Sequence, residues 1–452
     1  MFIPKRINVG FQDKEVANYI RLAYVIYWDE NDILRKERSW NSWRNQDVPA
    51  KEFDNEPTDG FRLNLPTGGS QRAHTVDCNN KLCTGRHVYH HFASGTMNKS
   101  HTYYGCDFVM NPMEFVRESR ELGSLCPGWN LHCNLYANPR CSVTTPFDML
   151  FNQIKEESRG EGKHGTCGYG VWETIKRNWN EPYKYGFTFE ELCKYFDGDF
   201  LSNKGILPLR QKLIEIRDGY YRDEIRRHGI NLTDEWKKLF YSDKLIQHWI
   251  MDAKQMCWLV QCCELTVAMK LVNPSDVIFE FGQGILLDYD NLEYAPHLTC
   301  AKTGLDGINQ LHNVDYKCII HNADSFKVYY VTRTYLTRHG VGRLDRECAR
   351  DAISNNMMED KTNVPNPFQN HLRYAPMDYD ALIKRIVADC KPYNCRVNIV
   401  FTHCNELSVR LGKLKDSVNK YFEDRLHIYE QFAEGESFEN LKNYFLKPLD
   451  KF

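Results

Sequence analysis

Short apolar segments that end in glycine-containing or polar turns alternate with long helical stretches over most of the chain. Segments of this length, bounded by Gly, Pro or polar residues, are typical of buried strands in a parallel sheet. The clearest of them are residues 276–281, 327–337 and 397–401. Apolar residues recur at helical spacing in residues 146–159 and 207–228, and residues 234–271 are expected to form one long helix or two abutting helices. The alternation predicts an α/β fold with a large, mostly parallel central sheet flanked by helices.

The N-terminal part of the chain does not follow this alternation. Residues 7–9 and 22–28 are strand-like and are separated from later segments by polar, turn-prone residues. We therefore expect residues 1–64 to form a small β-rich module of unknown role and residues 65–452 to form the α/β domain.

Charge and composition narrow the class of protein. The chain has 58 Lys and Arg against 60 Asp and Glu, so it has no overall basic field and no general nucleic-acid partner is expected. Trp40 and Trp43 lie beside arginines and could stack on bases, but the balanced charge of their segment favours a packed or surface role. No apolar stretch has the length of a signal peptide or a membrane span. With 17 scattered Cys, reduced thiols and a cytoplasmic location without a membrane partner are expected.

Glycine-rich turns with polar side chains supply the first candidate sites. In residues 68–76 two glycines let the backbone approach a ligand, and His74 is either a catalytic group or a hydrogen-bonded core histidine. Residues 160–170 contain five glycines and Thr166, which suits either an anion site or a flexible lid. No Walker sequence is present in the chain.

Strands also run into tight turns further along the chain. Gln283 lies between two glycines after the strand at 276–281, where its amide could read a polar ligand edge. The segment 337–342 is a similar turn that contains Arg338 and His339. Cys78, Cys83, His87 and nearby histidines could be drawn as a zinc site, but their spacing fits no short zinc motif, so a structural role is favoured.

Taken together and in order, these motifs resemble the adenylosuccinate synthetase family. That family carries a Gly-Gly-x-Asn-Ala-Gly-His-Thr loop, a Gly-Thr-Thr-Gly-Arg-Gly loop, a Phe-Glu-Gly-Ala-Gln-Gly strand end and a Thr-Arg-x-Gly-x-Gly turn. The corresponding segments here are residues 68–75, 165–170, 279–284 and 337–342. The resemblance spans about residues 68–406, and the segments 335–340 and 372–378 look closer to the phage branch, which makes 2-aminoadenylosuccinate from dGMP.

The resemblance implies a carbon–nitrogen ligase. A nucleoside triphosphate, ATP or GTP, would phosphorylate the 6-oxygen of a purine nucleotide such as IMP or dGMP, and aspartate or another amino acid would displace the phosphate. It also implies Mg²⁺ as cofactor, a homodimer, and a cytoplasmic setting, which for a phage-encoded protein is the cytoplasm of the host.

The resemblance assigns roles position by position. Catalytic roles fall on His74, Gln283 and Asp13. Substrate-binding roles fall on Gln71, Thr166, Cys167, Leu287, Thr299, His339, His371 and Arg373. Nucleotide-binding roles fall on Thr75, Arg338, Thr402 and Asn405, and metal-binding roles on the Ala73 backbone and Asp13.

Departures from the family pattern leave the activity open. The family begins with Gly-Asp-Glu-Gly-Lys-Gly-Lys, whereas residues 10–15 contain one glycine, Gly10, and lack the later ones, so Asp13 is a weak match for the catalytic Asp. Cys167 replaces a Thr and His371 replaces an aspartate-binding Arg. Asn405 replaces the Asp that accepts guanine N–H groups, which favours ATP. The family's C-terminal nucleotide loop is not recognisable in residues 408–452, which are expected to be helical. The alternative is a purine-nucleotide-binding pseudoenzyme, a sensor or decoy without phosphoryl transfer.

Overall fold

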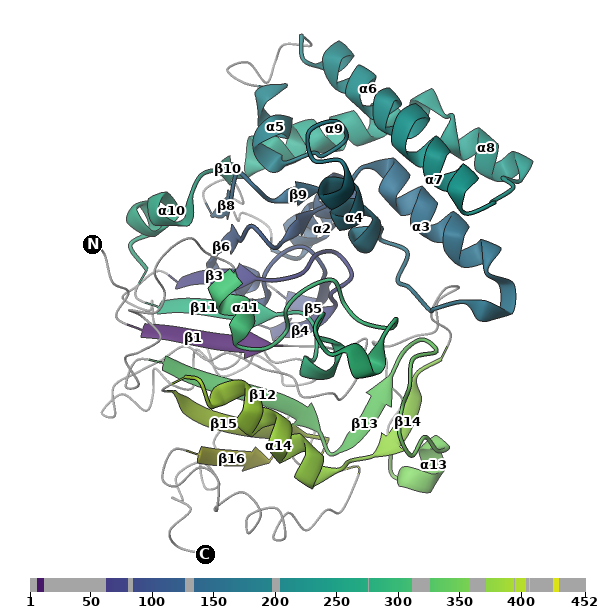
Figure 1. Ribbon diagram of the computed structural model, residues 1–452. Coiled ribbons are helices and arrows are strands. Elements are labelled where there is room, and N and C mark those ends of the chain that lie inside the picture. Colours follow the sequence, from purple (N-terminus) through teal and green to yellow (C-terminus); the bar gives the residue numbers. More distant parts are fainter. Residues whose placement is uncertain are drawn as a thin grey trace, which may run out of the picture.

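A parallel sheet is the centre of the molecule (Figure 1). The computed structural model describes residues 6–11, 62–79, 84–126, 134–196, 204–274, 276–310, 326–357, 371–393, 395–403, 406 and 426–430. Within these residues the sheet has nine strands, and every pairing between neighbours is parallel. Their order is β10 (Gln261–Cys262), β8 (Leu135–Ala137), β6 (His101–Tyr104), β3 (Arg62–Pro66), β11 (Asp276–Phe281), β1 (Arg6–Phe11), β12 (Phe326–Arg333), β15 (Arg396–Thr402) and β16 (Leu426–Glu430). The predicted α/β class with a mostly parallel sheet is confirmed.

The described residues also form three two-stranded sheets apart from the central sheet. The antiparallel pairs are β4 (His74–Asn79) with β5 (Thr84–Tyr89) and β13 (Tyr335–Arg338) with β14 (Arg373–Pro376). A short parallel pair is formed by β7 (Val109–Met110) and β9 (Ser142–Val143).

The helices fall into two groups: some pack on the central sheet, and others form a separate lobe with a hydrophobic core of its own. Helices α10 (Leu265–Val272), α11 (Asp306–Gln310) and α14 (Tyr379–Cys390) share a hydrophobic core with the strands of the sheet. The lobe at the top of Figure 1 contains α3 (Pro146–Ser158), α4 (Val171–Asn180), α5 (Phe189–Lys194), α6 (Ile206–Glu215), a π-helical turn (Ile216–Tyr221), α7 (Arg222–Arg227), α8 (Asp234–Phe240) and α9 (Asp243–Leu259). Helix α2 (Pro112–Leu125) packs against α9, and α13 (Arg350–Ile353) lies beside β14.

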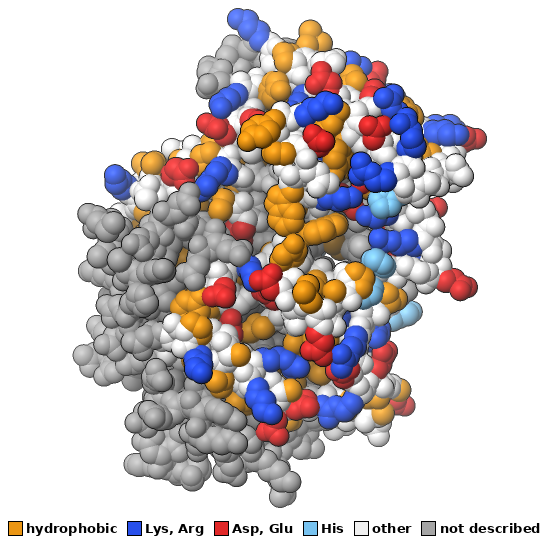
Figure 2. Space-filling model, viewed as in Figure 1, with side chains coloured by type: hydrophobic (Ala, Val, Ile, Leu, Met, Phe, Trp, Pro, Cys, Tyr) orange, Lys and Arg blue, Asp and Glu red, His pale blue; other side chains and the backbone are white. Residues whose placement is uncertain are grey.

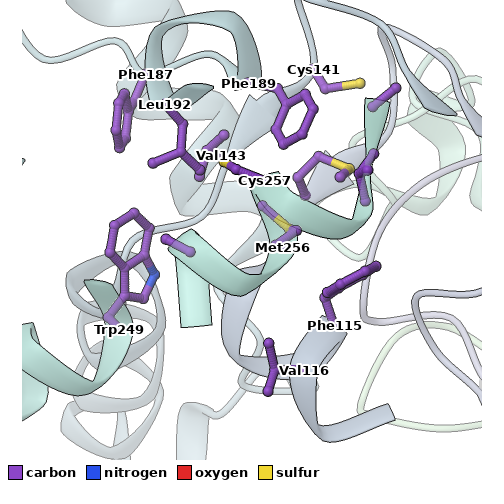
Figure 3. Packing of buried hydrophobic residues seen from close by; sticks show 14 of the residues in the cluster. Phe115, Val116, Cys141, Val143, Phe187, Phe189, Leu192, Trp249, Met256 and Cys257 are labelled. Atoms are coloured by element: carbon purple, nitrogen blue, oxygen red, sulfur yellow. The ribbon is translucent and has the colours of Figure 1, made fainter. Parts of the chain in front are cut away.

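The lobe has its own hydrophobic core. Phe115 of α2, Phe189 and Leu192 of α5 and Trp249 and Met256 of α9 are buried together (Figure 3). The Trp249 indole donates a hydrogen bond to the carbonyl oxygen of Thr144 at 3.0 Å, so this large ring is buried with its polar atom paired.

Several predicted elements are confirmed and others differ. Helix α3 begins where expected because Thr145 forms a capping box with Asp148. The stretch 234–271 is instead α8, α9, β10 and α10, since Thr233 and Ser242 each cap a new helix and Val260 is extended. The segment 327–337 divides into β12 and β13, and Leu426–Glu430 is a strand where helix was expected.

The N-terminal strand lies in the middle of the central sheet. Strand β1 pairs with both β11 and β12, so residues 6–11 are part of the main sheet and not of a separate one. Strand β3 crosses the boundary predicted after residue 64. The second predicted strand, 22–28, lies outside the described residues, so the domain division is still a prediction.

Two features of the described residues relate to the expected cellular location: the oxidation state of the cysteines and the length of the helices. Eleven described cysteines are free thiols, but Cys126 is disulfide-bonded, so the expectation of reduced thiols is wrong at that position. Within the described part of the chain, no helix is long and apolar enough to cross a bilayer.

The lobe depends on a buried ion pair between α4 and α3. The guanidinium of Arg177 donates to both carboxylate oxygens of Asp148 at 2.9 Å, and the side chains of both residues are buried. It also donates to the carbonyl oxygens of Val143 and Tyr185 at 2.9 and 2.6 Å.

Arg177→Ala is predicted to lower the free energy of unfolding by about 3–5 kcal/mol, because it leaves the Asp148 carboxylate buried without its cation. Urea unfolding measures this. The control, Arg117→Ala, removes an exposed pair with Glu114 and Glu121 and should cost less than about 1 kcal/mol. Equal losses in the two variants would contradict the prediction.

Candidate functional site

The loops expected to carry chemistry emerge from one edge of the central sheet. Residue 67 follows β3, Gly282 follows β11 and Thr334 follows β12. Because these strands are parallel, their carboxyl ends meet at the same edge, where ligands bind in open α/β sheets. Strand β1 ends there as well, with Phe11 opposite Phe281 in the register.

A cavity of about 820 Å³ lies beside this edge, a size typical of small-molecule sites. It lies between the helical lobe and the lower part of the molecule, and Figure 2 shows a hollow there. The predicted site residues that line it are Gln71, Thr166, Cys167, Gln283, Leu287, Thr299, Arg338 and His339. They come from segments far apart in the sequence, so the fold brings this part of the predicted site together.

A buried carboxylate anchors the loop that carries His74. Glu280, near the end of β11, accepts a hydrogen bond from the backbone N–H of Ser94 at 3.0 Å, and it also pairs with the Ser94 hydroxyl and with Nδ1 of His74. The Arg72 guanidinium lies 3.2 Å from the same carboxylate, and all of these side chains are buried. Although burial opposes ionisation, Arg72 and His74 lower the pKa of Glu280 to about 2. The carboxylate is therefore ionised and fixes the orientation of the imidazole.

Sequence reasoning missed the partners of His74. It did not assign roles to Glu280, Arg72 or Ser94, which come from different segments. A signal for Glu280 was present, because it is an acidic residue inside the otherwise apolar end of a strand. His74 itself is fully buried and does not line the cavity, whereas Gln71 from the same loop does.

Gln71 and Gln283 present their amides close to the cavity. Both side chains are largely buried. Gln283 donates to the carbonyl oxygen of Gly282 at 3.0 Å, and the Oε1 atom of Gln71 has no hydrogen-bond partner among the residues that the structure describes. A buried amide oxygen without a partner beside a cavity is suited to accept a hydrogen bond from a ligand.

The glycine-rich loop 160–170 is held by Glu156 and by a close backbone contact. Buried Glu156 accepts the backbone N–H of Gly165 at 2.6 Å and pairs with Arg159 at 2.7 Å. Gly165 has φ +77°, and a Cβ atom there would lie 2.5 Å from the Cα of Gly340. Only glycine fits such a contact between the loop and the turn that contains Arg338. The loop is therefore docked on the lower part of the molecule and closes one side of the cavity.

Comparison with known sequences decides the family. A sequence model described as adenylosuccinate synthetase matches residues 66–364, more than half of the chain. The chain belongs to the adenylosuccinate synthetase family. This is a family of carbon–nitrogen ligases, and the matched segment contains both the His74 loop and the lining of the cavity.

Curated relatives match only part of their own length. Adenylosuccinate synthetase from Francisella philomiragia is 25% identical over 292 residues, which cover 63% of this chain and 59% of the relative. The enzyme from Dichelobacter nodosus is 24% identical over 291 residues, covering 63% and 58%. The chain thus spans less than two thirds of the length of these relatives.

A solved structure of the family shares the fold. A fully ligated adenylosuccinate synthetase from Plasmodium falciparum superposes with a TM-score of 0.53 at 16% identity, covering 76% of this chain and 71% of that one. The succinoaminodeoxyadenylate synthetase of cyanophage S-2L, bound to dGMP and dATP, gives a TM-score of 0.48 at 13% identity over 85% and 91%. The second value is too low to support a conclusion about fold or substrate.

The structure places Arg373 outside the cavity. Its guanidinium forms a bidentate pair with Glu347 and donates to the carbonyl oxygens of Gly340 and Gly342 at 2.6 and 2.7 Å. The pair with Arg373 also holds the pKa of Glu347 below its ordinary value. His371 is exposed and, like Arg373, is absent from the cavity lining. A substrate carboxylate that used Arg373 would have to displace Glu347, so the aspartate-binding role of both residues is still a prediction.

Other predicted residues are placed only in part. Thr75 in β4 and Ala73 before it are buried and do not line the cavity. Thr402 is the last residue of β15, at the same sheet edge as the site. Asp13 and Asn405 lie outside the described residues.

The described residues do not make up a magnesium site. Among them no group of three His, Cys, Asp or Glu side chains could hold a metal ion. Glu280 is already paired with His74, Ser94 and Arg72.

Glu280→Gln should destabilise the protein in a pH-dependent way. The pKa of Glu280, about 2, lies below its ordinary value of 4.5, so the ionised group stabilises the fold at neutral pH. That contribution is lost as the pH falls from about 4.5 toward 2. Denaturant unfolding at several pH values between about 7 and 3 measures the free energy of unfolding of the variant and of the wild type. The difference between the two should become smaller below about pH 4.5.

The control for this prediction is Glu190→Gln, which removes an exposed carboxylate paired with Lys194. It should leave unfolding nearly unchanged at every pH. If the loss of unfolding free energy in Glu280→Gln stayed constant down to pH 3, the pairing of ionised Glu280 with Arg72 and His74 would be contradicted.

Gly165→Ala should weaken nucleotide binding, whereas Gly160→Ala should not. Both glycines have positive φ, +77° and +58°, so each substitution carries a similar backbone cost of about 1–2 kcal/mol. A Cβ atom at Gly160 meets nothing within 4 Å, but one at Gly165 would push the loop away from Gly340. Calorimetric binding of a purine nucleotide, with thermal unfolding as the stability control, measures the difference. Equal binding by the two variants would show that loop docking does not shape the site.

Proposed function

We propose that the protein is an ATP- or GTP-dependent ligase that joins aspartate, or another amino acid, to the 6-oxo position of a purine nucleotide such as IMP or dGMP. The observation that carries the proposal is the family match over residues 66–364 together with the convergence of its motif residues on one cavity. His74, held by Glu280, lies in the loop that also supplies Gln71 to that cavity.

The reaction would proceed in two steps. The γ-phosphoryl group of the triphosphate is transferred to the purine 6-oxygen, which makes that oxygen a good leaving group. The amine of the amino acid then forms a bond to C6, and inorganic phosphate leaves with the C6–O bond electrons. His74 would polarise or protonate the 6-oxygen, and Gln283 would hold the purine edge.

The end of β1 supports a role for Asp13. Gly10 lies opposite Glu280 and Phe11 opposite Phe281, so β1 ends beside the strand that carries the His74 anchor. Asp13 follows two positions after the strand end in the sequence. This favours Asp13 as the catalytic base and as a Mg²⁺ ligand, although residues 10–15 contain only one glycine, Gly10, and lack the later glycines of the family's phosphate loop.

The remaining assignments follow the family. Asn405 in place of the guanine-binding Asp favours ATP over GTP. We also propose that the protein binds Mg²⁺ together with the triphosphate and that it forms a homodimer. Its proposed location is the cytoplasm, which is that of the host if the gene belongs to a phage.

A pseudoenzyme that binds purine nucleotides is the second candidate. The pairing of Arg373 with Glu347 favours it, because this arginine is then occupied and not available to an amino acid carboxylate. A sensor or decoy would need the cavity but not phosphoryl transfer.

The His74→Ala variant should distinguish the ligase from the pseudoenzyme. With Mg²⁺, aspartate, ATP or GTP, and IMP, dIMP, GMP or dGMP, the wild-type protein should release nucleoside diphosphate and phosphate. The variant should lose about 10²–10⁴-fold in kcat, a range typical of general acid–base catalysis, while still binding nucleotide. The control, His248→Ala, removes an exposed histidine of α9 paired with Asp252 and should keep full activity. Nucleotide binding by calorimetry without turnover in any combination would favour the pseudoenzyme.

A further inference from the structure

Three aromatic side chains form an exposed cluster at the edge of the cavity. Trp172 and Trp179 lie seven residues apart on helix α4, so both project from the same face of the helix. Their rings are in edge contact with centroids 6.1 Å apart, and the ring of Trp179 makes the same kind of contact with Tyr289 at 6.1 Å. The exposed fractions are 42% for Trp172, 59% for Trp179 and 41% for Tyr289. This aromatic cluster therefore leaves much of its ring surface open to a further contact.

The aromatic cluster is continuous with the cavity. Trp172 and Tyr289 line the cavity, as does Leu292, an aliphatic side chain that is 76% exposed. In Figure 2 orange, hydrophobic side chains lie beside the hollow. Exposed apolar surface that adjoins a small-molecule cavity is typical of a ligand-binding surface. A ligand in the cavity can cover this surface with an apolar group of its own.

The lining of the cavity offers little positive charge to a substrate with two carboxylates. Each lysine or arginine that lines it, among the residues that the structure describes, already has a carboxylate or carbonyl partner. The pairs are Lys155 with Glu173 at 3.1 Å, Arg159 with Glu156 at 2.7 Å, and Arg338 with the carbonyl oxygens of Arg343 and His297 at 2.7 and 2.9 Å. Arg338, which has carbonyl partners, is the cation that the family resemblance assigns to the nucleotide.

Two histidines of the lining do not add positive charge at neutral pH. The rings of His164 and His297 are in edge contact, with centroids 5.0 Å apart. Burial lowers the pKa of both imidazoles, and the neighbouring cations Arg159 and Arg338 contribute to the lowering. Both rings are therefore neutral at pH 7.

The two positions expected to grip the carboxylates of aspartate are not arranged for that role. Arg373 forms a bidentate pair with Glu347, and His371 is exposed; neither side chain lines the cavity. A dicarboxylate needs charged donors for each of its carboxylates. An amine that carries an apolar group in place of the second carboxylate has no such need.

The aromatic cluster lies close to the turn where the family resemblance places the amino acid. The segment that follows Tyr289 packs against this turn, because Arg343 pairs with Glu293 at 2.8 Å and lies over the ring of Tyr294 at 5.7 Å. Arg373 donates to carbonyl oxygens of the same turn. An apolar group on the amine can therefore reach the aromatic cluster from the place expected for the amino acid.

We infer that the amine joined to the purine carries an aromatic or large apolar group, which packs against Trp172, Trp179 and Tyr289 where aspartate would carry its side-chain carboxylate. The inference rests on the proposed function and narrows the amino acid that it leaves open. The bond changes are those of the proposed reaction: the amine nitrogen forms a bond to C6 and loses a proton to solvent, and phosphate leaves with the electrons of the C6–O bond. The ring contacts give the amine its affinity and its selection.

The test measures which amine is consumed. The wild-type protein is supplied with Mg²⁺, ATP or GTP, and IMP or dGMP, together with phenylalanine, leucine, phenethylamine or aspartate. Mass spectrometry identifies the substituted purine nucleotide, and phosphate release gives the rate. The kcat/KM should be at least about 10-fold higher with phenylalanine than with aspartate. Phenethylamine has the same ring without a carboxylate, so its rate separates an aromatic amino acid from an aromatic amine as the substrate.

Substitutions in the aromatic cluster should act on the amine alone. Trp172→Ala and Tyr289→Ala should each raise the KM for phenylalanine about 10-fold, because each removes a ring contact and the apolar area that it buries. Trp172→Phe keeps a ring at this position and should restore most of the affinity. The two positions lie on different segments, so one variant remains informative if the other fails to fold.

Trp258→Ala is the matched control. Trp258 is another exposed indole on a helix of the lobe, 61% exposed near the end of α9, and it does not line the cavity. This variant should use every amine like the wild type.

The outcomes distinguish this inference from the proposed function. If no amine is consumed, the ligase and the inference both fail. If aspartate is consumed and the apolar amines are not, the ligase stands and the inference is overturned. It is also overturned if the variants slow the reaction equally with every amine, if they weaken nucleotide binding at an unchanged KM for the amine, or if size-exclusion chromatography shows that they convert a dimer to a monomer. In those cases the rings shape the cavity, stack on the nucleotide base, or bind a second copy of the chain.

Discussion

The carboxylate of Glu280 joins the segments on which the candidate site is built. An ionised carboxylate that is fully buried is stable only when cations and N–H or O–H donors surround it. Arg72, His74 and Ser94 meet that need, and they come from two segments that follow different strands. The pairing therefore ties the end of β11 to the His74 loop and to the start of the short helix at Ser94–Asn98.

Arg72 extends this connection. Its guanidinium donates to the carbonyl oxygen of Phe92 at 2.8 Å as well as pairing with Glu280. The neighbouring backbone is held from the other side by Glu118 of α2, which accepts N–H groups of residues 90 to 92. The imidazole of His74 is thus oriented by one carboxylate, while a second carboxylate holds the chain that packs beside it. Such support keeps a side chain in a single geometry.

Close backbone contacts set the shape of the cavity, whereas paired charges set its chemistry. The Gly165–Gly340 contact brings the helical lobe against the turn that ends at Gly342. A side chain at Gly342 would collide with the guanidinium of Arg338. Arg338 then donates to the carbonyl oxygens of Arg343 and His297 at 2.7 and 2.9 Å. Arg373 also donates to this turn, although it does not line the cavity.

Local patterns in the sequence determined the class of fold and most of the motif residues of the cavity. Apolar strand segments, capped helices and glycine turns are encoded by neighbouring residues, so β11, α3 and the Gln283 turn could be predicted. The family resemblance carried by the ordered motifs also predicted substrate-binding roles for Gln71, Thr166 and Thr299, and the three residues line one cavity. Tertiary structure alone decided that β1 lies inside the main sheet, that Glu280 holds His74, that Arg373 pairs with Glu347 and that His164 meets His297. These are contacts between residues far apart in the chain, and no local periodicity or spacing specifies which distant partner a buried charge or strand edge will find.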